Sequence, residues 1–329
     1  MSELAYPWLQ PHWRQLSAYA EQQRMPQALI FSGHAGLGKE ALAITFAHSL
    51  LCLKPNHNSA CGFCHACALL EAGNHPDLLF LQPEEPGKQI GIDAVRRLIT
   101  RLALKPQYER QRVVIIQPAD AMNTAAANAF LKCLEEPTER TRFILLTTHA
   151  NRLPATIRSR CQHLQFLPPD PILAAKWLNQ QGVKQAPERM LAMAQGSPLL
   201  ALDYAQQGLE SVRMQVFNDW LSVIQHPAQV IEVAEQWQKQ SSVSLEVLLT
   251  WLANWLTDLV KLSLSNQQAQ LQNPDLQSRL QGLVNQLNLP AVYAHYDHLN
   301  NSRQQLQTTL NKQLILERLL LEWSRINRG

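Results

Sequence analysis

The chain has 329 residues, enough for two or three domains of ordinary size, and 46% of them are hydrophobic, which can supply packed cores. Its 29 basic and 26 acidic side chains leave a net charge of +3. So small a charge does not indicate nucleic-acid binding by the chain as a whole.

Nothing near the N-terminus has the pattern of a targeting signal. Residues 1–8 lack a basic segment followed by an apolar run, and no uninterrupted apolar stretch approaches the about 18–20 residues that cross a membrane. We therefore expect a cytoplasmic protein that does not interact with membranes. In that compartment its six cysteines should be reduced thiols or metal ligands.

Short apolar runs alternate with helical segments through the first half of the chain. Such runs suit buried parallel strands, and the alternation predicts an α/β domain with helices on both faces of the sheet. The expected strands are residues 28–31, 78–81, 113–116 and 143–146, with 162–167 as a candidate fifth. The expected helices run from Lys39 to Leu53, from Ile92 to Leu104 and from Ala121 to Leu134.

The first expected strand leads into a sequence that resembles a nucleotide-binding P-loop. Gly33, Gly36 and Gly38 free backbone N–H groups to hold phosphates, and Lys39 adds a positive charge for the terminal phosphates. Glu40, however, stands where a Ser or Thr hydroxyl normally binds Mg²⁺. A carboxylate there repels a bound triphosphate unless a cation lies between them.

The acids that activate water in P-loop ATPases are also missing. They follow an apolar strand, but here the strand at 113–116 ends in Gln117 and Pro118. Asp120 lies beyond the strand end, where we expect an N-cap or first-turn acid of the next helix rather than a displaced catalytic group. The sequence therefore predicts the frame of an ATPase without hydrolysis, and it leaves nucleotide binding open.

Four cysteines predict a structural metal site. Cys61, Cys64 and Cys67 form a tight knuckle, and Cys52 ends the preceding helix. Four thiolates complete the tetrahedral coordination of Zn²⁺ and leave no open position for catalysis. An iron–sulfur cluster is the main alternative, although the fourth Cys and the Pro typical of it do not follow the knuckle. Unligated buried thiols are a second alternative.

The second half of the chain is expected to be helical. Strand patterns stop at the break formed by residues 168–171, and helices are expected at 171–182, at 187–195 and from Pro198. An apolar stripe from Leu245 to Val260 has helical spacing and suits a core helix. Residues 306–326 are apolar on more than one face, which suggests burial. We predict domains at 1–167, including the cysteine module 52–67, at 168–207 and at 208–329.

Together these motifs resemble the AAA+ clamp-loader subunits of bacterial replication. The resemblance rests on the P-loop, on the four-cysteine insertion, on Asn128 to Pro137 and on Ile157-Arg158-Ser159-Arg160-Cys161. It covers about the first 200 residues and implies an AAA+ P-loop domain, a small helical lid and an all-α collar that forms oligomers. It also implies a stator that hydrolyses no ATP, in a five-subunit ring with gamma/tau and delta subunits that loads the sliding clamp onto primed DNA.

The resemblance assigns roles to individual residues. Arg160 would be an arginine finger that reaches the ATP of a neighbouring subunit, since a guanidinium binds phosphate oxygens bidentately. The alternative is a structural arginine that caps the short helix before it. Thr148 matches the family's first sensor position, whereas Leu199 stands at the position of the second sensor arginine.

A basic stripe offers a contact to DNA. Arg97, Arg101 and Lys105 are spaced to align along the outer face of the helix that begins at Ile92, where they can follow a phosphate backbone or form a solvated face. Two further classes of function stay open: an active ATPase of the gamma/tau type, and a separate zinc-bearing nucleic-acid module.

Overall fold

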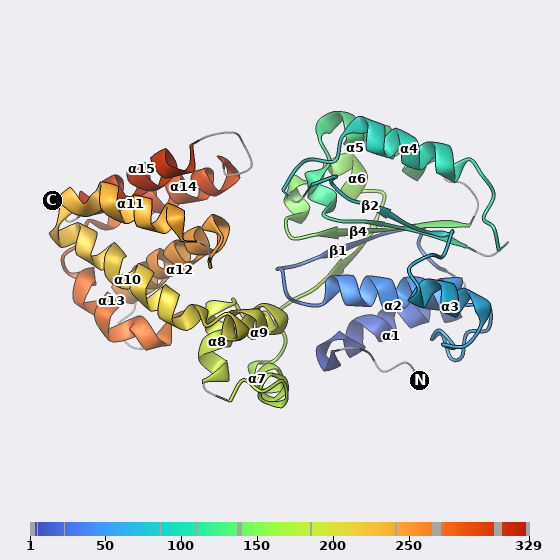
Figure 1. Cartoon of the computed structure of the whole chain (residues 1–329), viewed down its shortest axis with the longest axis horizontal. Helices are drawn as coiled ribbons and strands as arrows, with labels where there is room; N and C mark the ends of the chain where they lie inside the picture. Colours follow the sequence, from blue (N-terminus) through green and yellow to red (C-terminus); the bar gives the residue numbers. More distant parts are fainter. Residues whose placement is uncertain are drawn as a thin grey trace. The chain divides into compact units, whose positions relative to one another are not determined.

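The computed structural model describes residues 4, 6–22, 24–85, 87–108, 111–136, 140–184, 186–240, 242–264, 271–305 and 311–326. The chain divides into two compact units, Met1–Pro169 and Asp170–Gly329 (Figure 1). The first is an α/β unit and the second is built from helices.

A parallel sheet forms the centre of the first unit. Its strands are β1 (Ala28–Ser32), β2 (Leu78–Leu81), β3 (Arg112–Ile116), β4 (Thr141–Thr147) and β5 (Gln162–Gln165). They pair in the order β2-β3-β4-β1-β5, with every neighbouring pair parallel. Val113, Val114, Ile115 and Ile116 are all buried in β3, because the sheet is covered on both faces. The predicted α/β class is confirmed.

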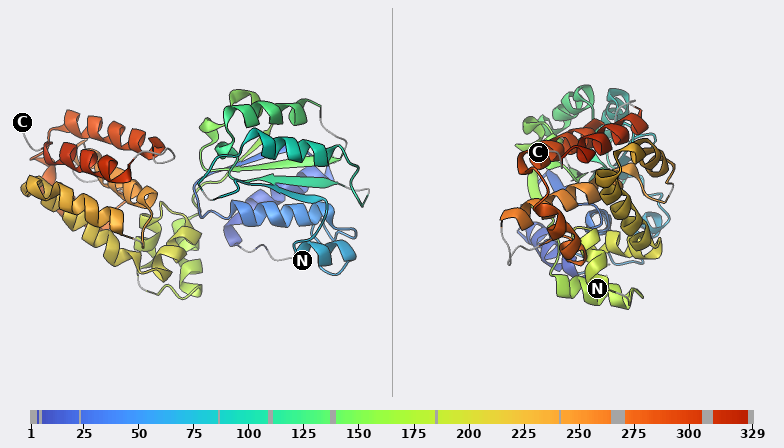
Figure 2. Two further views of the ribbon diagram at one scale, coloured as in Figure 1. Left: turned by 45° about the horizontal axis from the view of Figure 1, so that its top comes forward. Right: turned by 90° about the vertical axis from the view of Figure 1, so that its left-hand side faces the viewer.

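Helices cover the two faces of this sheet (Figure 1; Figure 2, left). On one face lie α4 (Ile92–Leu102), α5 (Thr124–Glu135) and α6 (Ala155–Arg158), and on the other lie α1 (Gln10–Glu21) and α2 (Lys39–Leu51). The remaining helices of the unit are η1 (Pro7–Leu9), α3 (His65–Glu71), η2 (Ala119–Ala121) and η3 (Ala150–Arg152). Val95 and Leu98 of α4 and Phe130 of α5 pack with the strands in one buried core.

Several predicted helix ends were wrong. In the second unit, the helices predicted to end at residues 182 and 195 end at Gln180 and Met193. The helix α5 begins at Thr124 and not at Ala121, because Asn123 caps it by accepting a hydrogen bond from the N–H of Ala126 at 2.8 Å. The helix α4 ends at Leu102 and not at Leu104. The Arg112 guanidinium binds the carbonyl oxygens of residues 101 and 104, which closes the helix end.

The second unit consists of helices. They are α7 (Pro171–Gln180), α8 (Pro187–Met193), α9 (Pro198–Gln206), α10 (Leu209–Gln225), η4 (Pro227–Gln229), α11 (Val230–Lys239), α12 (Leu245–Leu264), η5 (Pro274–Leu276), α13 (Gln277–Val284), α14 (Leu289–Gln305) and α15 (Lys312–Ser324). Asp170 begins α7 by accepting hydrogen bonds from two N–H groups of its first turn. The boundary predicted at residue 207 stays a prediction.

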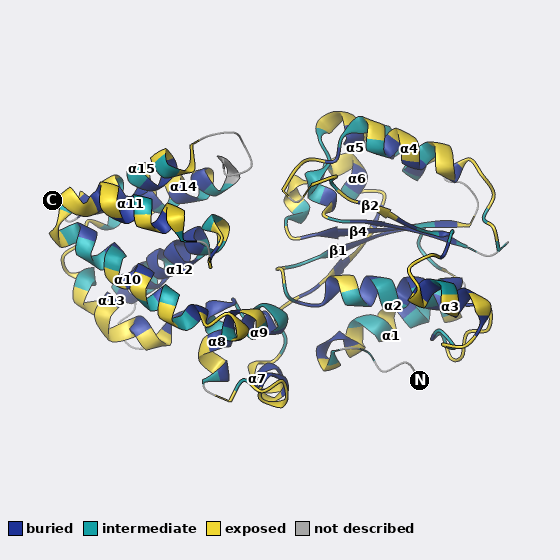
Figure 3. Ribbon diagram, in the orientation of Figure 1, coloured by how far each residue is buried: buried dark blue, intermediate teal, exposed yellow. Residues whose placement is uncertain are grey.

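The apolar stripe expected from Leu245 to Val260 lies on α12, of which more than half the residues are buried (Figure 3). By length and hydropathy α12 can cross a membrane, but 61% of its most apolar window is buried inside the unit. Trp251 and Trp255 are among the largest fully buried side chains of the described residues, as expected of a core helix. Residues 306–310 of the predicted C-terminal apolar segment lie outside the described residues; in α15, Leu316 and Trp323 are buried.

Candidate functional site

The P-loop connects β1 to α2, and close packing requires glycine at two of its positions. Gly38 begins α2 with a φ of +85°, and a Cβ there would lie 2.8 Å from Cδ2 of Tyr6. A Cβ on Gly33 would lie 2.4 Å from the carbonyl oxygen of Phe166. Gly36 also has a positive φ, +76°. All three glycines therefore have a left-handed backbone, and Gly33 and Gly38 are packed against neighbouring segments.

Lys39 is turned back onto this loop. Its ammonium donates to the carbonyl oxygens of Gly33 and His34, both at 2.6 Å, and the residue is only 8% exposed. Burial lowers the pKa of Lys39 to about 8, although the carboxylate of Asp120 opposes this shift. The loop's own carbonyl groups thus bind the amine predicted to meet phosphates.

The two residues that replace catalytic groups contact each other. The side-chain amide of Gln117, which follows β3, donates to Oε2 of Glu40 in the first turn of α2 at 2.9 Å. These residues are 77 positions apart in the sequence, so no local pattern reveals the contact. The hydrogen bond joins β3 to α2 at the place where an ATPase needs a magnesium ligand and an acid.

Asp120 and the neighbouring strand end form a second contact. Asp120 lies in η2, as a first-turn acid of that short helix and not as the cap of α5. Its Oδ1 accepts a hydrogen bond from the Thr147 hydroxyl at 2.6 Å. Burial opposes ionisation, but hydrogen bonds from His149 and Thr147 outweigh it and hold the pKa of Asp120 below its ordinary value.

Thr148, predicted at the sensor position, lies one residue beyond β4. Its side chain is exposed, and its hydroxyl lies 2.9 Å from Nδ1 of His149. The buried hydroxyl at this strand end belongs instead to Thr147. The assignment of Thr148 stays a prediction.

The four cysteines of the predicted metal site lie together. Their sulfur atoms are all within 4.8 Å of one another, with 3.9 Å between Cys52 and Cys64 and 3.8 Å between Cys61 and Cys67. Thiolates at about 2.3 Å from a tetrahedral Zn²⁺ are about 3.8 Å apart, so the cluster fits one ion. Burial opposes ionisation of Cys64, but the N–H of Cys67 and neighbouring thiols lower its pKa to about 6.

Two short segments hold this cluster. Cys64 caps α3 by accepting a hydrogen bond from the N–H of Cys67, and Cys52 follows the last residue of α2. The predicted continuation of α2 to Leu53 was wrong, because Cys52 has an extended backbone with ψ of 131°. This turn directs the chain into the knuckle.

Arg160 lies between α6 and β5 on the surface of the first unit. Its Nη1 donates to the carbonyl oxygen of Thr156 at 3.0 Å, and its Nη2 donates to Oε1 of Glu135 at 2.9 Å. The Arg160 side chain is 39% exposed, whereas the next residue, Cys161, is buried in the core. A buried neighbour thus fixes the backbone while the guanidinium reaches the surface. The carbonyl contact is also the one expected of a capping arginine.

The basic stripe is shorter than predicted. Arg97 and Arg101 lie on α4, but Lys105 lies beyond the helix end, which corrects the alignment expected for all three. The guanidinium of Arg97 pairs with Glu84 at 3.0 Å, and both side chains are largely exposed.

A buried ion pair behind this stripe had no signal in the sequence. Arg112 on β3 pairs with Asp77, which is 1% exposed, and its guanidinium also donates to the carbonyl oxygens of residues 101, 104 and 105. Asp77 in turn accepts from the N–H groups of Gln107 and Tyr108. The pair therefore fixes the turn that carries Lys105.

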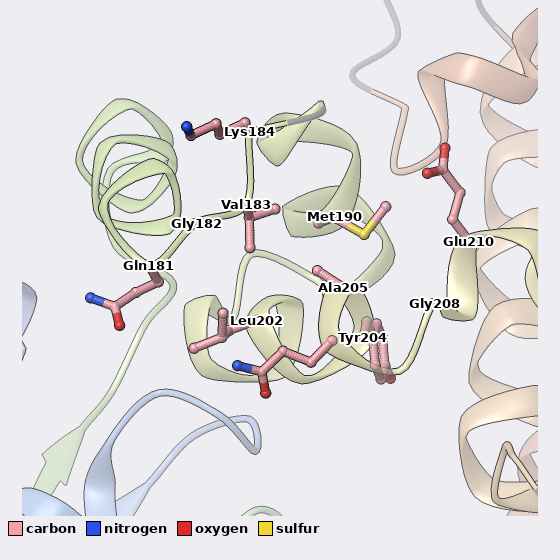
Figure 4. Close-up of a pocket in the computed structure, with 11 residues that line it drawn as sticks. Gln181, Gly182, Val183, Lys184, Met190, Leu202, Tyr204, Ala205, Gly208 and Glu210 are labelled. Carbon is pink, nitrogen blue, oxygen red and sulfur yellow. The ribbon is translucent and has the colours of Figure 1, made fainter.

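A hollow of about 490 Å³ lies within the helical unit (Figure 4). It is lined by segments between α7 and α10, including Met190, Leu202 and Tyr204. It contains none of the residues predicted to act, so it supports no assignment of a site.

The parallel sheet, the glycine-rich turn from β1 into α2 and the helical second unit define a P-loop protein of the AAA+ class. Two family models match the chain: DNA polymerase III, delta subunit, at residues 9–170, and DNA polymerase III, delta subunit, C terminal, at residues 209–325.

Several full-length relatives are more specific. DNA polymerase III subunit delta' of Pseudomonas aeruginosa is 36% identical over 324 residues, covering 97% of this chain and 97% of the relative. The same subunit of Escherichia coli is 33% identical over 330 residues, covering 96% and 94%. The chain therefore belongs to the delta' family of DNA polymerase III subunits, and the resemblance to clamp-loader subunits is confirmed.

Other similarities are partial or distant. The tau/gamma subunit of Haemophilus influenzae is 32% identical over 209 residues, which are 61% of this chain and 30% of that protein. A solved gamma subunit-related protein of Thermotoga maritima is 19% identical with a TM-score of 0.44, covering 96% of this chain and 99% of that one.

Proposed function

We propose that this chain is a non-hydrolysing stator of the bacterial clamp loader, an accessory subunit of the DNA polymerase III holoenzyme. It joins gamma/tau and delta subunits in a five-subunit ring that places the sliding clamp on primed DNA in the cytoplasm. Membership of the delta' family supports its place in the loader. The main support for the absence of hydrolysis is the hydrogen bond between Glu40 and Gln117, which stand where an ATPase has a magnesium ligand and a catalytic acid.

The test of hydrolysis uses the purified chain. We expect no magnesium-dependent ATP turnover above that of Lys39→Ala, because Glu40 replaces the hydroxyl ligand for Mg²⁺, and Gln117 and Pro118 replace the acids that directly follow the strand. A steady-state rate that Lys39→Ala abolishes would favour the alternative, an active ATPase of the gamma/tau type. Equilibrium binding of a fluorescent ATP analogue separates nucleotide binding from turnover.

We propose one structural Zn²⁺, held by Cys52, Cys61, Cys64 and Cys67. The sulfur separations suit a single ion, whereas the four thiolates of an iron–sulfur cluster are divided among two or four irons and cannot all lie so close together. Four protein ligands leave no position for substrate, so the ion stabilises the fold of the module without catalysis.

We propose that Arg160 acts in trans on the ATP of a neighbouring gamma/tau subunit. Its position on the surface, next to a buried residue, supports this role, and its planar guanidinium can bind two phosphate oxygens at once. In GTPase systems such a finger contributes about 10³–10⁵ in rate at the site that it serves. A loader with several ATP sites should lose only the share that this subunit serves.

The reconstituted loader provides the test. We expect Arg160→Ala to lower the DNA- and clamp-stimulated ATPase and clamp loading without changing zinc content or ring assembly. Arg160→Lys should restore little, because an ammonium lacks the planar fork. Arg152→Ala, at an exposed arginine of the preceding η3, is the matched control. If the Arg160→Ala complex loads clamps at the unaltered rate, the finger assignment is wrong and Arg160 only caps the preceding helix.

The basic stripe is proposed as a minor contact to DNA. Arg97 and Arg101 of α4 and Lys105 beyond its end are all exposed, so each can bind a phosphate. Replacing Arg101 and Lys105 with Ala should then weaken DNA binding by the loader and reduce its salt dependence. An unchanged salt dependence would identify the stripe as a solvated face.

A further inference from the structure

The guanidinium of Arg160 is anchored by two different elements. Thr156 of α6 accepts from Nη1, and Glu135, the last residue of α5, accepts from Nη2. Both helices are fixed in the same core, because Cys133 of α5 and Ile157 of α6 are buried together. The two anchors therefore have a defined separation, and they hold the plane of the guanidinium.

These anchors leave most of the guanidinium available. An arginine side chain has five N–H donors, and the two hydrogen bonds use two of them. Among the described residues the other three donors have no partner, so they are available to an acceptor outside the chain. The anchored side chain has already lost much of its rotamer freedom. A phosphate that approaches then meets an oriented fork, so less ordering is left for the moment of contact.

We infer that Glu135 is a positioning residue for Arg160, an inference that rests on the proposed arginine finger. The Glu135 side chain is 50% exposed, so the ion pair is weak enough to adjust when a phosphate binds. Glu135 can either orient the guanidinium of Arg160 or compete with phosphate for it, and the two roles predict opposite effects of its removal on the ATPase rate. If Glu135 mainly orients the guanidinium, its removal slows the neighbour's ATPase; if it mainly competes with phosphate, its removal accelerates it.

The experiment uses the reconstituted clamp loader, with kcat and KM for ATP measured in the presence of clamp and primed DNA. We expect Glu135→Ala to lower kcat about two- to fivefold, the range that an exposed ion pair can account for, and to leave KM unchanged. Glu135→Gln should keep more activity, because its amide oxygen can still accept from Nη2. Glu136→Ala removes the next, exposed carboxylate and should match the unmodified complex.

A double-mutant cycle separates this inference from the proposed function. In the Arg160→Ala background, Glu135→Ala should cause no further loss. An unaltered rate for Arg160→Ala alone refutes the finger itself. If Arg160→Ala is slow, then an unaltered or faster rate for Glu135→Ala, or an equal loss in both backgrounds, refutes the positioning role. Zinc content and ring assembly of each variant show that it is folded.

Discussion

The burial of the Lys39 amine in the P-loop can be tested directly. Its ammonium is nearly fully buried against two carbonyl groups, and burial lowers its pKa from 10.5 to about 8. The perturbation that we propose is Lys39→Met, which keeps the length of the side chain and removes the charge. The pH dependence of stability then isolates the buried amine.

The sign follows from counting protons. Below pH 8 the folded and unfolded chains both carry the Lys39 proton, so this group adds no pH dependence. Between about 8 and 10.5 the unfolded chain binds the proton more strongly, and stability therefore rises with pH. Across the full interval the gain is about 3 kcal/mol, of which about 2 kcal/mol falls between pH 7.5 and 9.5.

Urea unfolding of both proteins at several pH values measures this gain. We expect the free energy of unfolding of the unmodified chain to rise by about 2 kcal/mol relative to Lys39→Met between pH 7.5 and 9.5. The cysteines titrate in both proteins, so their contribution cancels in the difference. Lys88→Met, at an exposed lysine, serves as the control, and its free energy of unfolding should change with pH as that of the unmodified chain does. Parallel curves for Lys39→Met would refute the buried, desolvated amine.

Two further predictions concern the zinc module and the buried ion pair. We expect one zinc per chain by elemental analysis, and we expect a chelator or Cys61→Ser to release it and expose residues 52–67 to limited proteolysis; iron, or no metal, would contradict the assignment. Asp77→Ala should lower the free energy of unfolding by about 3–5 kcal/mol in urea, because it leaves the buried Arg112 unpaired. Asp93→Ala, which removes an exposed ion pair with Arg96, should cost about 0–1 kcal/mol, and equal losses would refute the argument.

The apolar patterns were sufficient to predict the sheet. The run Val113 to Ile116 is buried at every position, and continuous burial is what distinguishes a central parallel strand from an amphipathic one. The strand ends were less predictable. β3 and β4 begin earlier than the apolar runs, at Arg112 and Thr141, because backbone pairing starts before the first apolar side chain. Pairing is a property of two strands and leaves no trace in either sequence segment.

The polar contacts of the candidate sites could not be predicted in the same way. Glu40 meets Gln117 and Asp77 meets Arg112 across separations of 77 and 35 residues, and no period connects them. The cysteine module differs, because three of its ligands lie within seven residues and the chemistry of thiols limits what they can do. Local spacing therefore predicted that the four thiols lie together, whereas the partners of charged side chains required the fold.

A phosphate has to displace existing contacts at the P-loop, whereas at Arg160 it can bind without displacing any. A nucleotide at the P-loop must first replace the carbonyl groups that bind Lys39, and it then meets the carboxylate of Glu40, so its binding costs contacts that already satisfy buried groups. Arg160 is oriented by two acceptors and keeps three N–H donors, so a phosphate can add to its contacts. This combination suits the proposed role, in which the subunit acts on a neighbour's nucleotide and its own loop serves as a rigid support. The experiments on Lys39 and on Glu135 test these two properties independently.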